Sequence, residues 1–198
     1  MTLALAFILL VLTVPLAGGR LTRLEDVRLR SIWLAGLAFG IQVLIVTFIP
    51  DGDTTTLRVA HLASYALAGA CILRNLHIPF AWMIGLGGLM NVVAIAANGG
   101  VMPARLGALQ AAGLDVAGAG EFTNSDAVQG ANLAFLGDVF AIPAGWPGAN
   151  VFSVGDVVMV LGALLALHAL CGSRLGARLP RLMGRARAAP PAGRFPTL

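Results

Sequence analysis

Long apolar runs separated by short polar stretches dominate the chain. Each run is long enough to cross a hydrocarbon layer of about 30 Å as a helix that rises 1.5 Å per residue. Residues Asn98 to Ser153 interrupt this pattern with mixed polar and apolar positions. The runs that we predict to be membrane helices cover about 2–17, 31–49, 58–74, 80–97 and 154–171. The pattern therefore predicts an all-α membrane protein with five transmembrane helices and a loop segment, residues 98–153, between the fourth and fifth.

Composition agrees with a membrane protein and argues against a water-soluble domain. Hydrophobic residues make up 58% of the chain and charged residues 11%, and the mean hydropathy is +0.87. Too few polar side chains remain to cover a soluble surface. Cys71 and Cys171 stand singly, so we expect neither a disulfide framework nor a metal site, and no motif calls for a cofactor.

The distribution of charge predicts an orientation. Eleven of the 13 arginines lie before the second run, after the third or after the fifth, and seven of the nine acids lie at the opposite helix ends. The positive-inside rule then puts the N-terminus outside and the C-terminus in the cytoplasm. No basic residue precedes the first run, so we read it as an uncleaved helix. Because all 13 Lys and Arg positions are Arg, we expect a GC-rich bacterial genome. A bacterial multi-pass protein of this kind is expected in the plasma membrane.

Two polar segments face the cytoplasm in this scheme. Residues 172–198 contain six Arg and four Pro, which predicts a disordered basic tail after a transmembrane domain of residues 1–171. Such a tail would attract anionic lipid by about 1 kcal/mol per Arg, and we expect no nucleic-acid partner. Residues 20–30 place Leu21, Leu24 and Val27 at helical spacing, which predicts a short interfacial helix.

Polar side chains inside the apolar runs are candidates for function. His61, Ser64 and Tyr65 share one helical face of the third run, and Asn91 lies in the fourth. An amide in hydrocarbon needs hydrogen-bond partners, so we predict that Asn91 meets Ser64 or Tyr65. That contact can be interhelical packing alone. His61 can likewise be a packing residue or can reach the outer carboxylates.

Glycines supply close packing and a turn. Gly36 and Gly40 form a small-xxx-small pair, which predicts close helix approach in the second run. The outer segment opens with Asn98, Gly99 and Gly100, a sharp turn that exposes backbone. Pro103 then begins a short helix that ends at Ala112, with Gly113 in the C-cap position.

Two Gly-Asp pairs carry the strongest functional signal. Asp138 lies inside the apolar stretch from Ala131 to Ile142, which is too short to span and should lie at the interface or dip into the bundle. Asp156 opens the fifth run, and Ser153 precedes it at capping-box spacing, so this acid has a structural reason to be there. Paired carboxylates can also share a proton and activate water.

Four stretches resemble a family of bacterial multi-pass membrane proteins of the domain of unknown function 5317 type. They are His61-Leu-Ala-Ser64-Tyr65, Asn98-Gly-Gly-Val-Met102-Pro103, Phe135-Leu-Gly-Asp138-Val-Phe-Ala-Ile-Pro143 and Val151-Phe-Ser153-Val-Gly-Asp156, with Asn91 between the first two. The resemblance runs from Gly18 to about Leu170 and implies the membrane fold without an activity.

A local similarity points to lipoprotein signal peptidase, an intramembrane aspartyl protease. Phe152 to Asp156, preceded by Asp138, is similar to the sequence around its second catalytic aspartate, and Asn98-x-Gly100 is similar to its Asn-x-Gly motif. Ser153 replaces the motif's Asn, and the Asp/Lys motif of that family's first span is absent. The similarity implies an aspartyl site at Asp138 and Asp156.

These observations leave three classes of function open. In a hydrolase, Asp138 and Asp156 would activate water against a membrane peptide or lipid-linked bond, with Asn98, Gly99, Gly100 and His61 holding substrate. In a non-catalytic subunit or scaffold, the glycine faces and outer loop would bind a partner membrane protein. A small transporter is disfavoured because no run carries paired charges at mid-depth.

Overall fold

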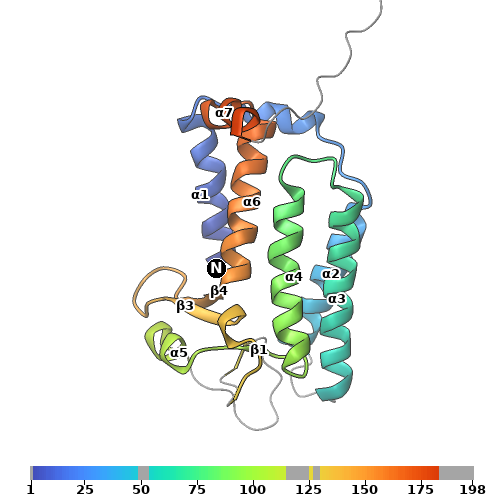
Figure 1. The fold of residues 1–198 in the computed structure, drawn as a ribbon, viewed down its shortest axis with the longest axis vertical. Coiled ribbons are helices and arrows are strands. Elements are labelled where there is room, and N and C mark those ends of the chain that lie inside the picture. Colours follow the sequence, from blue (N-terminus) through green and yellow to red (C-terminus); the bar gives the residue numbers. More distant parts are fainter. Residues whose placement is uncertain (1, 49–53, 115–124, 127–129, 183–198) are drawn as a thin grey trace, which may run out of the picture.

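The computed structural model describes residues 2–48, 54–114, 125–126 and 130–182. Its long helices follow the five apolar runs and lie side by side (Figure 1). Neighbouring pairs in contact are α1 with α6, α6 with α4, α4 with α3, and α3 with α2. The helices are α1 (Thr2–Leu16), α2 (Ile32–Val43), α3 (Thr54–Arg74), α4 (Ala81–Ala97) and α6 (Val154–Leu170). The predicted helices in these five places are thus confirmed as helices.

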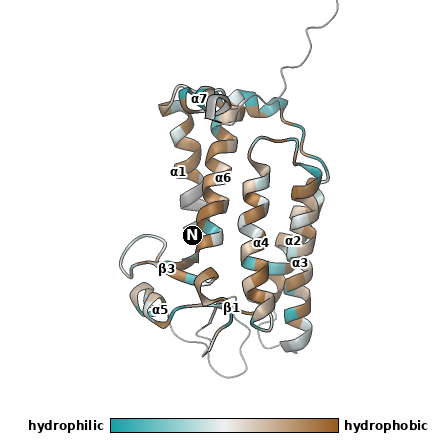
Figure 2. Cartoon of the chain, in the orientation of Figure 1, coloured by the Kyte–Doolittle hydropathy of each residue, from teal (hydrophilic) through white to brown (hydrophobic). Residues whose placement is uncertain are grey.

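Apolar side chains cover much of the outside of these helices. Hydrophobic colours dominate along them, and hydrophilic colours gather at the end that carries α7 (Figure 2). By length and composition, α3 is apolar enough to cross a membrane over Thr55–Arg74, whereas α2, α4 and α6 are apolar but shorter. A five-residue stretch of π-helix, η2 (Leu44–Phe48), extends α2 without a break.

The described chain is mostly helical, as predicted, and the outer segment adds short strands that were not predicted. Strand β3 (Asp138–Ile142) pairs antiparallel with β4 (Asn150–Ser153), and β1 (Met102–Pro103) pairs parallel with β2 (Ser125–Asp126). The apolar stretch that we expected to lie at the interface or to dip into the bundle forms a short 3-10 turn, η3 (Ala134–Leu136), and then β3. A short apolar run fits a strand as well as a helix, and pairing with β4 decides the matter here.

The short helix of the outer segment begins later than predicted. Helix α5 covers Leu106–Ala112, while Pro103 belongs to β1. Gly113 has a φ of 68° and its N–H bonds to carbonyls in the last turn of α5. The predicted glycine C-cap is therefore confirmed.

Arginine-rich elements lie across the other end of the bundle. Residues Leu21–Asp26 form a 3-10 helix, η1, where we expected a short helix. Arg174–Leu182 form α7, so the expectation of disorder in 172–198 is corrected for these residues, and 183–198 lie outside the described residues. Two backbone hydrogen bonds tie the end of α1 to the junction of α6 and α7, from Arg20 N to Cys171 O and from Arg174 N to Ala17 O.

A buried histidine reinforces this junction. His168 in α6 contacts Thr13 of α1 through Nε2 at 3.0 Å and Ser173 through Nδ1 at 2.7 Å. Because the Thr13 hydroxyl donates to Leu10 O, the His168 Nε2–H is the donor in the first contact. Ser173 Oγ also accepts the Gly176 N–H and so caps the start of α7.

Candidate functional site

The start of α6 carries the capping box that the sequence predicts. Asp156 N donates to Ser153 Oγ at 3.0 Å, and Ser153 N donates to Asp156 Oδ2 at 2.9 Å. The carboxyl group of Asp156 thus lies at the positive end of the helix dipole. Ser153 is fully buried. The cap is therefore part of the interior of the protein and not a surface feature.

Asn91 joins α4 to this cap with two further hydrogen bonds. Its Nδ2 donates to Asp156 Oδ1 at 2.8 Å, and its Oδ1 accepts the Ser153 hydroxyl at 2.8 Å. Both oxygens of Asp156 consequently hold protein donors. Donors on both oxygens fix the orientation of this side chain.

The prediction that Asn91 bonds to Ser64 or Tyr65 is therefore corrected. Ser64 donates to His61 O at 2.6 Å and accepts from Gln42 Nε2 at 3.0 Å, so it joins α3 to α2. Tyr65 does face α4, where it packs against a buried cluster that contains Ala94, Ile95 and Met102. The stronger acceptor, a carboxylate on α6, takes the Asn91 amide.

Glycines let α4 and α6 come close enough for these bonds. A Cβ on Gly155 would lie 2.0 Å from Asn91 Oδ1 and 2.6 Å from Gly87 O. A Cβ on Gly87 would lie 2.4 Å from Gly155 O and 2.6 Å from Met159 Cγ. Small residues thus pack one helix backbone against the other, as is common between membrane helices.

Strand pairing brings Asp138 to the same place. Asp138 is opposite Ser153 in the β3–β4 register, and its side chain is 4% exposed. Its backbone carbonyl accepts the Arg105 N–H at 3.0 Å. The preceding Gly137 passes so close to Pro103 that an added Cβ would meet its carbonyl oxygen at 2.1 Å. The second Gly-Asp pair is therefore also set by close backbone contact.

Tyr65 connects the two acids electrostatically. It lies within Coulomb range of both Asp156 and Asp138. His61 stacks at a tilt of 55° beside it, with 5.2 Å between the ring centroids, and is fully buried. Two carboxyl groups, a phenol and an imidazole therefore come from α3, β3 and α6 to one end of the apolar bundle.

The glycine turn that follows α4 has structural contacts of its own. Gly100 has a φ of 94°, its N–H donates to Ile95 O at 2.9 Å, and its carbonyl accepts His61 Nδ1–H at 3.3 Å. Gly99 also has a positive φ, of 70°. Because the Gly100 amide is already bonded, it does not supply a free donor for a substrate oxygen.

Asn98 holds the outer segment to the end of α4. Its Nδ2 donates to Ala94 O at 2.7 Å and to Asn132 O at 2.8 Å, while its Oδ1 accepts the Asn132 N–H at 2.9 Å. Asn132 Nδ2 returns a bond to Ala97 O at 3.1 Å. These bonds use the Asn98 amide for anchoring, where the sequence suggested substrate binding.

Two contacts of the site were not predicted from the sequence. Gln42 and Asn132 lie 22 and 34 residues from Ser64 and Asn98, which they contact only after folding, and nothing local marks them. Gly87 lies one turn before Asn91 on the same helical face, where a small residue is expected to permit the close helix approach that its contact with Gly155 shows. Within the described residues, no cluster of three or more His, Cys, Asp or Glu could hold a metal ion.

Comparison with known proteins gives a family and no activity. No curated protein and no solved structure matches the chain. A family model does match, over residues 26–168, which include every helix and strand of the site. The chain therefore belongs to the family of unknown function DUF5317.

Proposed function

We propose that this chain is a multi-pass protein of the bacterial plasma membrane, with five spans, an outer N-terminus and a cytoplasmic C-terminus. Helices α4 and α6 each have 17 residues, which is about 25 Å at the helical rise and close to the minimum for a span. Large apolar side chains such as Phe39, Leu89 and Leu161 remain exposed along the bundle. A hydrocarbon solvent would cover them.

Cysteine accessibility in intact cells tests this orientation. Cys71 and Cys171 would first be replaced by Ala, and single cysteines would then be introduced as Trp146→Cys in the β3–β4 turn or Ala177→Cys in α7. A membrane-impermeant maleimide should label the first and spare the second until the cells are broken. The reverse pattern would contradict the orientation.

We further propose that the outer polar site is an aspartyl hydrolase site that acts on a membrane peptide or a lipid-linked substrate. The β3–β4 register carries this proposal, because it aligns Asp138 with Ser153, the cap partner of Asp156. Two carboxylates brought close together favour a shared proton, which gives one acid and one base. The proximity of Tyr65 to both supports a single site.

The arrangement suggests separate roles for the two acids. Asp156, fixed by Asn91 and Ser153, would orient the attacking water and take its proton as the new bond forms. Asp138 would begin with the shared proton and give it to the leaving group as the bond to that group breaks. Its burial strengthens such electrostatic effects by excluding bulk water.

Complementation tests the hydrolase without knowledge of the substrate. A strain that lacks the protein would receive the native chain, Asp138→Asn or Asp156→Asn. Mass spectrometry would then measure the membrane peptides and lipid-linked molecules that accumulate in the deletion strain. Neither variant should clear these molecules, although Asp138→Asn should have the same melting temperature as the native chain. Normal clearance by Asp138→Asn would refute the hydrolase.

One observation favours a second candidate, a non-catalytic membrane subunit or scaffold. Both oxygens of Asp156 hold protein donors, as a purely structural carboxylate would. In that case Asp156→Asn would lower stability, Asp138→Asn would be harmless, and a partner membrane protein would co-purify in a fixed ratio.

A further inference from the structure

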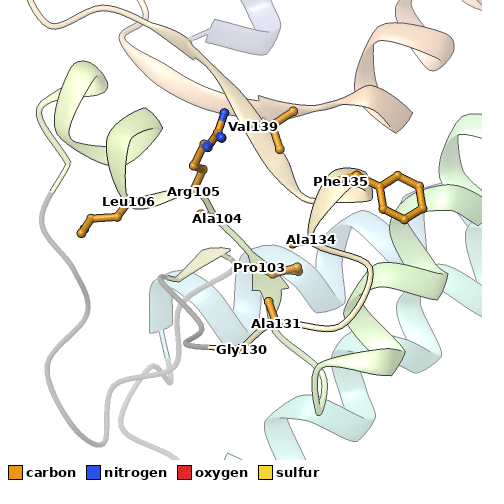
Figure 3. A pocket seen from close by; sticks show the side chains of 9 residues that line it. All are labelled: Pro103, Ala104, Arg105, Leu106, Gly130, Ala131, Ala134, Phe135 and Val139. Atoms are coloured by element: carbon orange, nitrogen blue, oxygen red, sulfur yellow. The ribbon is translucent and has the colours of Figure 1, made fainter.

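An apolar groove opens beside Asp138 on the outer segment. Its volume is about 820 Å³, large enough for a hydrocarbon chain with a small head group. Arg105 and Val139 lie at one end and Gly130 and Ala131 at the other (Figure 3). The lining residues are Pro103, Ala104, Arg105, Leu106, Gly130, Ala131, Ala134, Phe135 and Val139.

Backbone contacts place the floor of this groove against the proposed site. Ala104 forms a parallel bridge with Asp138, and Arg105 N donates to the Asp138 carbonyl. Val139 follows Asp138 directly in β3. A molecule in the groove would therefore contact residues that adjoin Asp138, the proposed catalytic acid.

The groove combines hydrocarbon contact with a single positive charge. Leu106 and Phe135 at its edge are 50% and 66% exposed. Arg105 is the one charged residue among those that line it, and its side chain is exposed. A guanidinium pairs with phosphate or carboxylate oxygens through several parallel hydrogen bonds.

We propose that this groove binds an amphiphile, with its hydrocarbon chain against the apolar lining and an anionic group, such as a phosphate, on Arg105. The proposal rests on the proposed function, since it names the substrate class of that same site. An anionic lipid-linked substrate can enter such a groove from the membrane interface, where apolar side chains like Phe135 are stable. An uncharged lipid would contact the apolar lining but leave Arg105 without an anion, and a free phosphate would bind Arg105 but leave the apolar lining empty.

Binding of defined probes to the purified full-length chain tests the proposal. In an uncharged detergent, oleoyl lysophosphatidic acid should bind about tenfold more tightly than mono-oleoylglycerol, the gain expected of a charged hydrogen bond. Inorganic phosphate at the same concentration should not compete, which separates a lipid head group from a free anion. Equal affinity for the two lipids, or full competition by phosphate, would overturn the proposal.

Matched variants locate the binding to the groove. Arg105→Gln should remove the preference for the charged lipid, whereas Arg178→Gln, the same change on exposed α7, should leave it intact. Ala134→Trp, an exposed position on η3, should weaken binding of both lipids by filling the groove. An unchanged preference in Arg105→Gln would refute the assignment.

The outcome can be separated from that of the hydrolase proposal. Asp138→Asn should still bind oleoyl lysophosphatidic acid, because the groove does not use that carboxylate for affinity. If this variant binds the lipid and also clears accumulated substrates, lipid binding in the groove is supported and the hydrolase proposal is refuted. If the native chain clears substrates but shows no lipid preference, the hydrolase proposal is supported and lipid binding in the groove is refuted.

Discussion

Replacing Gly155 by alanine should break the contact between α4 and α6 that organises the site. The new Cβ would lie 2.0 Å from Asn91 Oδ1 and 2.6 Å from Gly87 O, whereas ordinary contact begins at 3.4 Å. Both neighbours belong to a packed helix, so the helices must separate by about 1 Å or more. That separation removes the hydrogen bonds of Asn91 to Ser153 and Asp156.

The expected loss follows from three contributions. Overpacking costs about 1–3 kcal/mol, and two broken hydrogen bonds cost roughly 1 kcal/mol each. Alanine returns up to about 1 kcal/mol through helix propensity. The net loss in free energy of unfolding is therefore about 2–4 kcal/mol. Unfolding in mixed detergent micelles, followed by far-ultraviolet circular dichroism, measures it.

Gly36 provides the matched control. It lies within α2, and an added Cβ there meets no heavy atom of the described chain within 4 Å. Gly36→Ala should leave stability unchanged or raise it by up to about 1 kcal/mol. A loss below about 1 kcal/mol in Gly155→Ala, or an equal loss in the two variants, would show that close approach of α4 and α6 does not matter.

Two further substitutions and one labelling experiment test other contacts. Asn91→Leu should lower the free energy of unfolding by about 2–4 kcal/mol, since it removes the acceptor of the Ser153 hydroxyl and the donor to Asp156 Oδ1; a neutral result in the same micelle assay would argue against the network. Ser173→Ala should cost about 1–2 kcal/mol by removing the cap of α7 and a partner of His168, which a drop in melting temperature would reveal. Cys71 and Cys171 are 7% and 1% exposed, so maleimide should label them in denaturant and leave them unmodified in the native protein; rapid native labelling would contradict this burial.

The helices could be predicted because their information is local. Apolar runs of spanning length gave the positions of α1, α2, α3, α4 and α6 to within a few residues. The capping box at Ser153 and the C-cap at Gly113 also depend on neighbours within one turn.

The remaining parts of the fold depend on distant residues. β3 was not predicted because Asp138–Ile142 becomes a strand only when β4 supplies its hydrogen-bond partners. Asn91 was correctly expected to need a partner, yet the choice between Tyr65 and Asp156 depends on which helix α4 packs against. α7 was not predicted, because the basic, proline-rich composition of its segment is typical of disorder.

The junction of α1 with α6 has a consequence for synthesis. α1 is made before α6, its neighbour in the bundle, and Thr13 meets His168 only after 155 more residues have been added. During translation, α1 must therefore remain without this neighbour until α6 has been made. We expect the first helix to be the last to acquire its native contacts, and truncation before α6 should leave it open to proteolysis or to capture by insertion chaperones.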